Sequence, residues 1–125
     1  MKKVIETTEA PAPIGPYNQA ILVDKTLYAS GQIALDPKTM ELVNEDIQAE
    51  TTQVMKNLSA VLKAAGMDFT NVVKATIYLA DMGDFDLVNE VYGGYFNNDD
   101  APARETVQVA QLPKNVRVEI SVIAI

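Results

Sequence analysis

Two stretches of this 125-residue chain have the hydrophobic spacing of an α-helix, and short strand-like segments precede, separate and follow them. The stronger stretch runs from Ile47 to Ala65, where apolar side chains recur at helical intervals. Asn44 or Asp46 can cap its start, and Gly66 stands where a C-terminal glycine is expected. We therefore predict a helix over this stretch.

A second helix is expected to begin near Asp84 and to carry apolar side chains as far as Phe96. Gly93 and Gly94 fall inside it, and each should cost about 1 kcal/mol relative to alanine. The two glycines therefore either fray the last turn or permit close packing.

The strand-like segments alternate apolar and polar residues. The expected strands are Gln19 to Val23, Thr26 to Gln32, Val72 to Ala80, Thr106 to Val109 and Val116 to Ala124. The first two are joined as a hairpin through Asp24-Lys25. On the third, Val73, Ala75, Ile77 and Leu79 share one face. Ahead of the hairpin, Ala10 to Pro16 holds three prolines and predicts an extended arm.

The predicted order is three strands, a helix, a strand, a helix and two strands. A single layer of two helices can cover only one face of the sheet. The second face of the last strand carries Arg117, Glu119, Ser121, Ile123 and Ile125. Because this mixture ends in apolar residues, it fits an interface better than water, and we predict a homo-oligomer.

The residue types that are missing exclude several kinds of chemistry. The chain has no cysteine, no histidine and no tryptophan. A thiolate nucleophile, a serine–histidine–aspartate triad and most zinc or iron sites are therefore excluded. The carboxylate pairs Asp84 with Asp86 and Asp99 with Asp100 lack a third ligand at suitable spacing, so no metal is expected.

The net charge and the short apolar runs limit which binding partners and which cellular location are expected. The net charge is -7, and no cluster of cations that could neutralise phosphates is visible, so neither nucleic acid nor a membrane surface is an expected partner. Glu6 interrupts the start of the only signal-like segment. We expect residues 1–125 to form one domain in the cytoplasm.

Glu119 is the first candidate for chemistry, because the centre of a strand disfavours glutamate. If an interface covers it, the carboxylate is partly desolvated and can be tuned to accept or donate a proton. The competing interpretation is a structural ion pair with Arg117, Arg104 or a lysine, and the spacing alone favours that interpretation.

Arg104 is the second candidate, at the start of a short strand on which it shares a face with Thr106 and Gln108. Its planar guanidinium could clamp the carboxylate of a small substrate through two hydrogen bonds. An exposed surface arginine, or a partner for one of the acidic residues, is the alternative that the residues alone favour.

Four further residues are weaker candidates. Ser30 has no base to activate it, so a hydrogen-bonding role suits it better than a nucleophilic one, and Gly31 permits a close backbone approach. Tyr17 could cap a pocket or simply pack as an aromatic residue, and Asn89 could be structural or exposed.

Three motifs in register resemble the reactive intermediate deaminase A (RidA, YjgF-type) family. They are Ala12-Pro13-Ile14-Gly15-Pro16-Tyr17-Asn18-Gln19-Ala20, then Ala29-Ser30-Gly31-Gln32-Ile33, and finally Pro102-Ala103-Arg104-Glu105-Thr106-Val107 followed by Leu112-Pro113-Lys114-Asn115-Val116-Arg117-Val118-Glu119-Ile120. The resemblance covers nearly the whole chain. It implies a chorismate-mutase-like α+β fold with a mixed sheet and two helices on one face. It also implies a homotrimer whose sheets line a central barrel, with sites between subunits.

The resemblance also implies an activity. Members of the family hydrolyse enamines and imines such as 2-aminoacrylate, 2-iminopropanoate and 2-iminobutanoate to 2-oxo acids and ammonia, without a cofactor. By the same resemblance Arg104 clamps the substrate carboxylate and Glu119 positions or activates water. Tyr17, Ser30 and Asn89 line the pocket, whereas Gly31 and Thr106 contact the ligand through their backbones.

Two positions depart from the family pattern: Thr106, where many members have cysteine, and Ser121, where an acidic residue is common. These departures leave open a relative specialised for another imine or enamine. A non-catalytic protein that binds 2-oxo acids is the main alternative function. A ribonuclease is a weaker one, because the chain has no histidine, two arginines and a net charge of -7.

Overall fold

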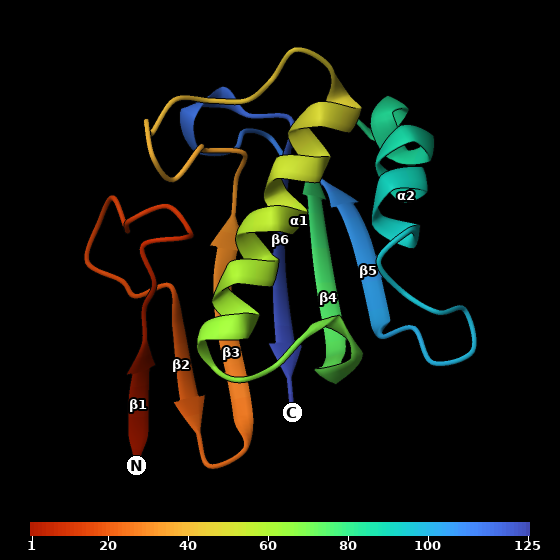
Figure 1. Ribbon diagram of the computed structural model, residues 1–125. Helices are drawn as coiled ribbons and strands as arrows, with labels where there is room; N and C mark the ends of the chain where they lie inside the picture. Colours follow the sequence, from red (N-terminus) through yellow and green to blue (C-terminus); the bar gives the residue numbers. More distant parts are fainter.

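The computed structural model describes residues 1–125 and contains one six-stranded sheet with two α-helices on the same face (Figure 1). The elements in chain order are β1 (Lys2–Ile5), β2 (Ala20–Val23), β3 (Thr26–Gln32), α1 (Ile47–Ala64), β4 (Val72–Leu79), α2 (Phe85–Gly93), β5 (Ala103–Gln108) and β6 (Val118–Ala124). Short 3-10 turns precede β4, α2 and β6. The predicted order of elements is confirmed, and β1 is the first strand of that order, to which no residues had been assigned.

The strands lie in the order β1-β2-β3-β6-β4-β5. Every neighbouring pair is antiparallel except β4 and β5, which are parallel, so the sheet is mixed. The last strand of the sequence therefore lies in the middle of the sheet, whereas β5 is an edge strand. This arrangement confirms the predicted α+β class and the single helical layer.

Helix α1 forms as its sequence pattern predicts. The Asp46 carboxylate accepts a hydrogen bond from the Ala49 backbone N–H at 2.7 Å, which satisfies one of the free donors at the helix start. At the other end Gly66 has φ +73°, a left-handed conformation that glycine adopts without strain. The apolar stripe of α1 packs on the sheet and forms the centre of the hydrophobic core.

Helix α2 is shorter than predicted, because it ends at Gly93 rather than near Phe96. A Cβ placed on Gly93 would have no atom within 4 Å, so the glycine serves no close packing and simply ends the helix. Tyr95 and Phe96 nevertheless stay in the core by packing on the ring of Phe69 at centroid distances of 5.2 and 5.4 Å.

Three strand predictions need correction. A register shift between Val72 and Lys74 turns Val72 inward and leaves Val73 exposed, so the predicted face of β4 is right only from Ala75 onward. Strand β5 extends from Ala103 to Gln108 rather than from Thr106 to Val109.

Strand β6 begins two residues later than predicted. Lys114 and Asn115 have φ of 56° and 55°, a left-handed turn that delays the extended backbone. Val116 is buried in a small second cluster of apolar side chains instead of in the strand.

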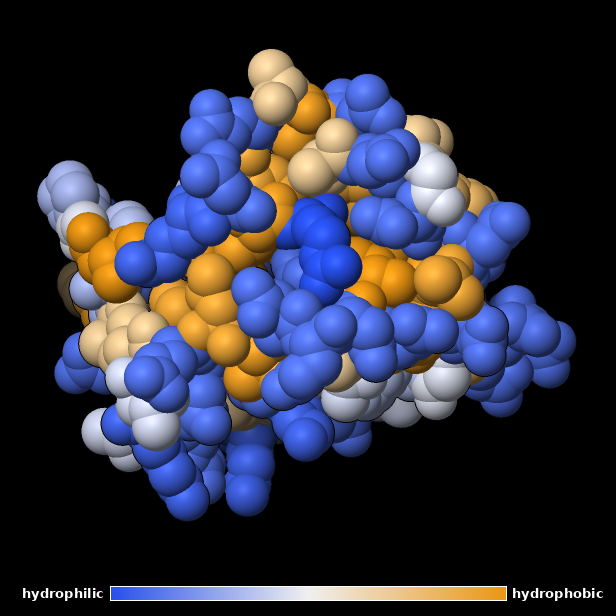
Figure 2. Space-filling model, turned by 90° about the horizontal axis from the view of Figure 1, so that it is seen from above, coloured by the Kyte–Doolittle hydropathy of each residue, from blue (hydrophilic) through white to orange (hydrophobic).

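The face of the sheet that carries no helix is partly apolar. Val4, Ile21, Tyr28 and Ile123 are register partners across β1, β2, β3 and β6, and Tyr28 is 50% exposed. In the end view of Figure 2, exposed hydrophobic patches likewise lie between polar side chains. Neither α-helix combines the length and the apolar composition that crossing a membrane requires.

Candidate functional site

A bulge in β3 holds two of the predicted site residues. Between its pairings with β6, strand β3 has one extra residue, so Ser30 and Gly31 together stand opposite Ser121. The Ser30 backbone N–H donates to the Gln19 carbonyl at 2.9 Å, and its hydroxyl donates to the Asn18 carbonyl at 2.6 Å. Such a bulge re-aims the backbone and side chains around it. Both hydrogen bonds of Ser30 therefore hold the chain's own backbone at the bulge.

Glu119 lies directly over Gly31. A Cβ on Gly31 would come within 2.8 Å of the Glu119 Cδ, so a larger residue here would displace the Glu119 carboxylate. The Glu119 carboxylate forms no salt bridge and no hydrogen bond within the chain, and burial raises its pKa. The structural ion pair considered for Glu119 is therefore not formed within one chain.

Tyr17 lies beside the same bulge. It is exposed, and its hydroxyl oxygen accepts from the Ile14 backbone N–H at 3.4 Å. Tyr17 and Gly31 line one small cavity of about 30 Å³ together with Ile14 and Ile33. Tyr17, Ser30, Gly31 and Glu119 thus form one group, which we call the bulge group.

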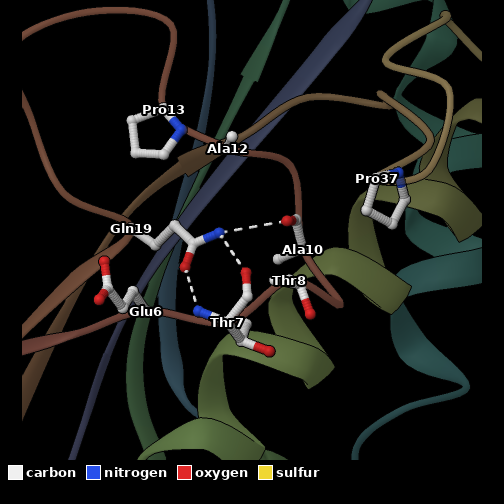
Figure 3. Close-up of a pocket in the computed structure, with 8 residues that line it drawn as sticks. All are labelled: Glu6, Thr7, Thr8, Ala10, Ala12, Pro13, Gln19 and Pro37. Carbon is white, nitrogen blue, oxygen red and sulfur yellow. Dashed lines mark hydrogen bonds between the residues drawn. The ribbon is translucent and has the colours of Figure 1, made fainter.

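The proline-rich arm that carries Tyr17 is fixed by Gln19, a residue that the sequence did not single out. The Gln19 side chain is 3% exposed, donates to the carbonyls of Thr7, Ala10 and Pro11, and accepts from the Thr7 backbone N–H. Figure 3 shows this side chain reaching toward the arm. A cavity of about 530 Å³ lies beside it, lined by Glu6, Thr7, Thr8, Ala10, Ala12, Pro13, Gln19 and Pro37. The sequence offered one indication of such a residue. The backbone N–H and C=O groups of an arm without strand partners need hydrogen-bond partners from elsewhere in the chain.

Arg104 belongs to a second group on the edge strand β5. Its Nη1 donates to the Asn89 Oδ1 at 2.7 Å, and its Cζ lies 4.9 Å from the centroid of the Tyr92 ring and 5.7 Å from that of Phe85. The two salt bridges within the chain involve other cations, so no carboxylate partners Arg104. The alternative that Arg104 pairs with an acidic residue of its own chain is therefore wrong.

A cavity of about 220 Å³ opens beside Arg104 and Asn89, and its other lining residues are Tyr92, Gly93, Phe96, Asn98, Ala101 and Pro102. The Tyr92 hydroxyl is buried without a hydrogen-bond partner. Burial raises the pKa of Tyr92, and the charge of Arg104 partly offsets that effect. Thr106 also has a buried hydroxyl without a partner, two residues along β5. We call Arg104, Asn89 and Tyr92 the edge group.

The two groups do not meet within one chain. Arg104 is the register partner of Ala75, which is buried beneath the helices. Glu119 is the register partner of Tyr78, which belongs to the opposite face of the sheet. Because residues opposite each other share a face, the two charged side chains leave the sheet on opposite sides.

The other arginine, Arg117, is used within the chain. The Glu50 carboxylate accepts from the Arg117 Nε at 2.7 Å and from its backbone N–H at 2.8 Å, and Arg117 Nη2 donates to the Asn44 carbonyl. Glu50 is 1% exposed. Glu50 follows Ile47 by three residues and precedes Val54 by four, so it lies on the apolar stripe of α1. This spacing could have identified Glu50 as a buried residue from the sequence.

Comparison with known proteins identifies the family. The sequence model of Endoribonuclease L-PSP, the YjgF/RidA family, matches residues 7–125. The chain belongs to this family. The human 2-iminobutanoate/2-iminopropanoate deaminase is 53% identical over 125 residues, which cover 100% of this chain and 90% of that protein.

Two solved structures of YjgF/RidA relatives have the same fold. The Rid-family protein YyfA from Yersinia pestis is 49% identical with a TM-score of 0.95, covering 99% of this chain and 98% of the other. The E. coli protein TdcF, solved with bound serine, is 40% identical with a TM-score of 0.92 and covers 98% of each chain. The predicted family membership is confirmed.

Proposed function

We propose that this protein is a deaminase that hydrolyses 2-iminopropanoate, 2-iminobutanoate and related 2-imino acids to 2-oxo acids and ammonia. Relatives at 53% to 55% identity over 125 residues carry the name 2-iminobutanoate/2-iminopropanoate deaminase. The geometric observation that carries the proposal is the Arg104 guanidinium. It stands beside an open cavity with no carboxylate partner of its own.

The proposed site needs more than one copy of the chain. One chain sends Arg104 and Glu119 to opposite faces of the sheet, so a cleft that contains both draws them from two protomers. The uncovered face offers the apolar row of Val4, Ile21, Tyr28 and Ile123 for burial. We propose a homotrimer in which these faces line a central barrel and the edge group of one protomer meets the bulge group of the next.

Arg104 and Glu119 divide the chemistry in this proposal. Arg104 binds the substrate carboxylate through two charge-assisted hydrogen bonds and so orients the protonated imine. A water held by Glu119 attacks the imine carbon, a C–O bond forms, and the water proton passes to the Glu119 carboxylate. The product of this step is a tetrahedral carbinolamine.

The second half of the reaction returns the proton. Protonated Glu119 gives its proton to the carbinolamine nitrogen, the C–N bond breaks, and the hydroxyl proton leaves with ammonia as the 2-oxo acid forms. One positioned acid/base group contributes roughly 10²–10⁴-fold, which is sufficient because imines also hydrolyse unaided in water. The pKa of Glu119, raised by burial, suits a group that both accepts and donates a proton.

The other predicted residues have supporting roles in the proposed site. Tyr17 and Ser30 shape the wall around the bulge, Gly31 leaves room for Glu119, and Asn89 orients Arg104. Thr106 contacts the ligand through its backbone, which fits a position where the hydroxyl is buried.

A binding protein that uses the same cleft without turnover is the second candidate function. The observation that favours it is the serine bound to the relative TdcF, because serine carries the carboxylate that Arg104 would clamp. RNA is not the proposed substrate, because the net charge is -7 and one of the two arginines is tied to Glu50.

Adding the purified protein to freshly generated 2-iminopropanoate and following its decay tests the proposal. We expect faster decay with the wild-type protein and loss of the acceleration in Glu119→Ala, which should still bind 2-oxo acids. An unchanged decay rate with wild-type protein that binds pyruvate would replace the deaminase by the binding protein. An unchanged rate without binding would remove both.

A further inference from the structure

We propose that Tyr92 is a positioning residue for Arg104, and that Tyr92, Asn89 and Phe85 form an uncharged cradle that leaves the guanidinium charge free for the substrate carboxylate. The proposal rests on the proposed function, because it assigns Arg104 the task of binding a carboxylate. It adds to that function the way in which the chain holds this side chain in place.

Three contacts from α2 hold the guanidinium, and none of them carries a charge. Asn89 Oδ1 accepts one hydrogen bond from Nη1 at 2.7 Å. The face of the Tyr92 ring lies 4.9 Å from the Arg104 Cζ and that of Phe85 lies 5.7 Å from it. Both distances are within the range at which an aromatic ring attracts a cation. The cradle therefore restricts the guanidinium without neutralising it, and at least part of its hydrogen-bonding capacity stays unused.

The buried environment of Tyr92 shows which part of that residue the chain uses. The side chain is 5% exposed and packs against the ring of Phe96 at a centroid distance of 4.7 Å. Its hydroxyl is buried and has no hydrogen-bond partner, which is unfavourable for a polar atom. A hydrogen bond inside the chain therefore does not explain why residue 92 is a tyrosine. The ring of Tyr92, in contrast, has a defined contact with Arg104.

The absence of a carboxylate in the cradle matters as much as the ring. The other arginine shows the contrast, because Arg117 is bound by Glu50 on the neighbouring helix. A carboxylate in place of the Asn89 amide would bind the same guanidinium and compete with the substrate. An Asn89→Asp variant therefore converts the open arginine into a closed pair by changing one exposed position.

Binding of pyruvate, measured by calorimetry, tests the cradle separately from turnover. We expect Tyr92→Leu to weaken pyruvate binding about three- to tenfold, which corresponds to the loss of a cation–π contact. Tyr92→Phe, which retains the ring, should restore the affinity. Asn89→Asp should weaken binding about tenfold or more, because a charged hydrogen bond now competes. With imine substrates these variants should raise KM far more than they lower kcat, since Glu119 lies elsewhere.

Tyr95→Leu is the matched control, because Tyr95 also packs its ring in the core, against Phe69, but has no contact with Arg104. If Tyr92→Leu does not fold, Asn89→Asp still decides the question, since its side chain is exposed. Wild-type affinity in Tyr92→Leu or in Asn89→Asp would overturn the cradle. Equal losses in Tyr92→Phe and Tyr92→Leu would also overturn it, because they would assign the effect to the hydroxyl.

The failure of the cradle can be told from the failure of the proposed function. A wild-type protein that hydrolyses imines while the cradle variants bind pyruvate normally would remove the cradle alone. A wild-type protein that binds pyruvate but does not hydrolyse imines would remove the deaminase, and the affinities of the variants would still decide the cradle.

Discussion

The chain contains two arginines, and they differ in whether a carboxylate of the same chain binds the guanidinium. Arg117 is held by the carboxylate of Glu50, which is almost fully buried, and by the Asn44 carbonyl. Arg104 is held by an amide and two aromatic rings and has no anionic partner. The same difference separates the two glutamates near β6, because Glu50 is paired whereas Glu119 has no cation or donor within the chain.

This difference separates charges that stabilise the fold from charges that are left available. A buried ion pair satisfies both members and fixes the elements that carry them, here α1 and the start of β6. An unpaired arginine and a partly buried, unpaired glutamate on opposite faces cannot satisfy each other in one chain. In the proposed site, the two groups meet in a cleft between protomers, where the substrate carboxylate pairs with Arg104 and a water is held by Glu119.

The largest expected effect comes from substituting Arg104 in one chain and Glu119 in another, first in pure variants and then in a mixed assembly. Arg104→Ala and Glu119→Gln should each lower the rate of imine hydrolysis by roughly 10²–10⁴-fold, because each removes one of the two groups. If the two variants are co-expressed and assemble at random, about one site in four receives both wild-type residues from neighbouring protomers. We expect the mixed assembly to regain about that fraction of the wild-type rate.

Measured rates of the two pure variants and of a mixture prepared without subunit exchange are the controls. No recovery in a verified mixed assembly would show that Arg104 and Glu119 do not act across protomers, and it would contradict the proposed site.

The next largest effect is expected from breaking the closed pair. Glu50→Gln leaves Arg117 without its counter-charge, and because Arg117 is partly exposed we expect a loss of about 2–3 kcal/mol in the free energy of unfolding. Denaturant titration measures this loss. The control is Glu45→Gln, at an exposed position with no salt bridge, which should change stability little. Equal losses in the free energy of unfolding for the two substitutions would mean that the Glu50–Arg117 pair does not stabilise the fold.

A smaller effect is expected at the bulge. Gly31→Ala places a methyl group against the Glu119 carboxylate, so the flexible end of this side chain must move, at a cost of about 1 kcal/mol or less. The rate of imine hydrolysis should fall because the carboxylate is displaced from its position. The control is Gly93→Ala, where an added methyl has nothing within 4 Å and lies at the end of a helix, so stability should stay the same or rise. A Gly31→Ala protein with wild-type stability and rate would show that Glu119 does not need this space.

The smallest effect is a shift in pH dependence. Burial raises the pKa of Glu119, and in the substrate complex the substrate carboxylate compensates Arg104, so burial should dominate there. The rate at saturating substrate should therefore fall as the pH decreases through this raised pKa, at a higher pH than for an exposed glutamate. An acid limb at the pKa of an ordinary glutamate would contradict the assignment.

The stability of Glu119→Gln gives the same shift from the folding side. A raised pKa means that the folded state binds the proton more tightly, so this stabilisation is complete below the unfolded pKa and is lost as the pH rises through the folded pKa. Glutamine suffers no such loss. With pyruvate bound to compensate Arg104, the variant should thus gain stability relative to the wild-type protein as the pH rises toward neutrality. Thermal unfolding at several pH values with saturating pyruvate measures this gain.

The local elements could be predicted well, because each depends on residues that are close together in sequence. The cap at Asp46, the glycine at the end of α1 and the two-residue hairpin turn at Asp24-Lys25 all follow from neighbouring side chains. The end of α2 was misjudged, because apolar spacing continued past the two glycines although the helix did not.

The candidate site could be predicted only as a set of residues. The resemblance to the family named Arg104, Glu119, Tyr17, Ser30, Gly31, Asn89 and Thr106, but nothing in the spacing showed that they form two separate groups. Gln19 and Tyr92 were missed, since an amide at a strand start and an aromatic residue on a helical stripe look like ordinary core positions. Their roles depend on partners far away in the sequence.

The sequence by itself determined the supply of chemical groups and the local structure: no histidine or cysteine, two arginines, two helices in one layer, and an arm that cannot be a strand. Only the tertiary structure decided which charges are paired. Strand order places β6 in the middle of the sheet and β5 at its edge, and the register sends Arg104 and Glu119 to opposite faces. The physical reason is that helix caps and turns are set by nearby residues. Strand order and register are set by burial summed over the whole chain.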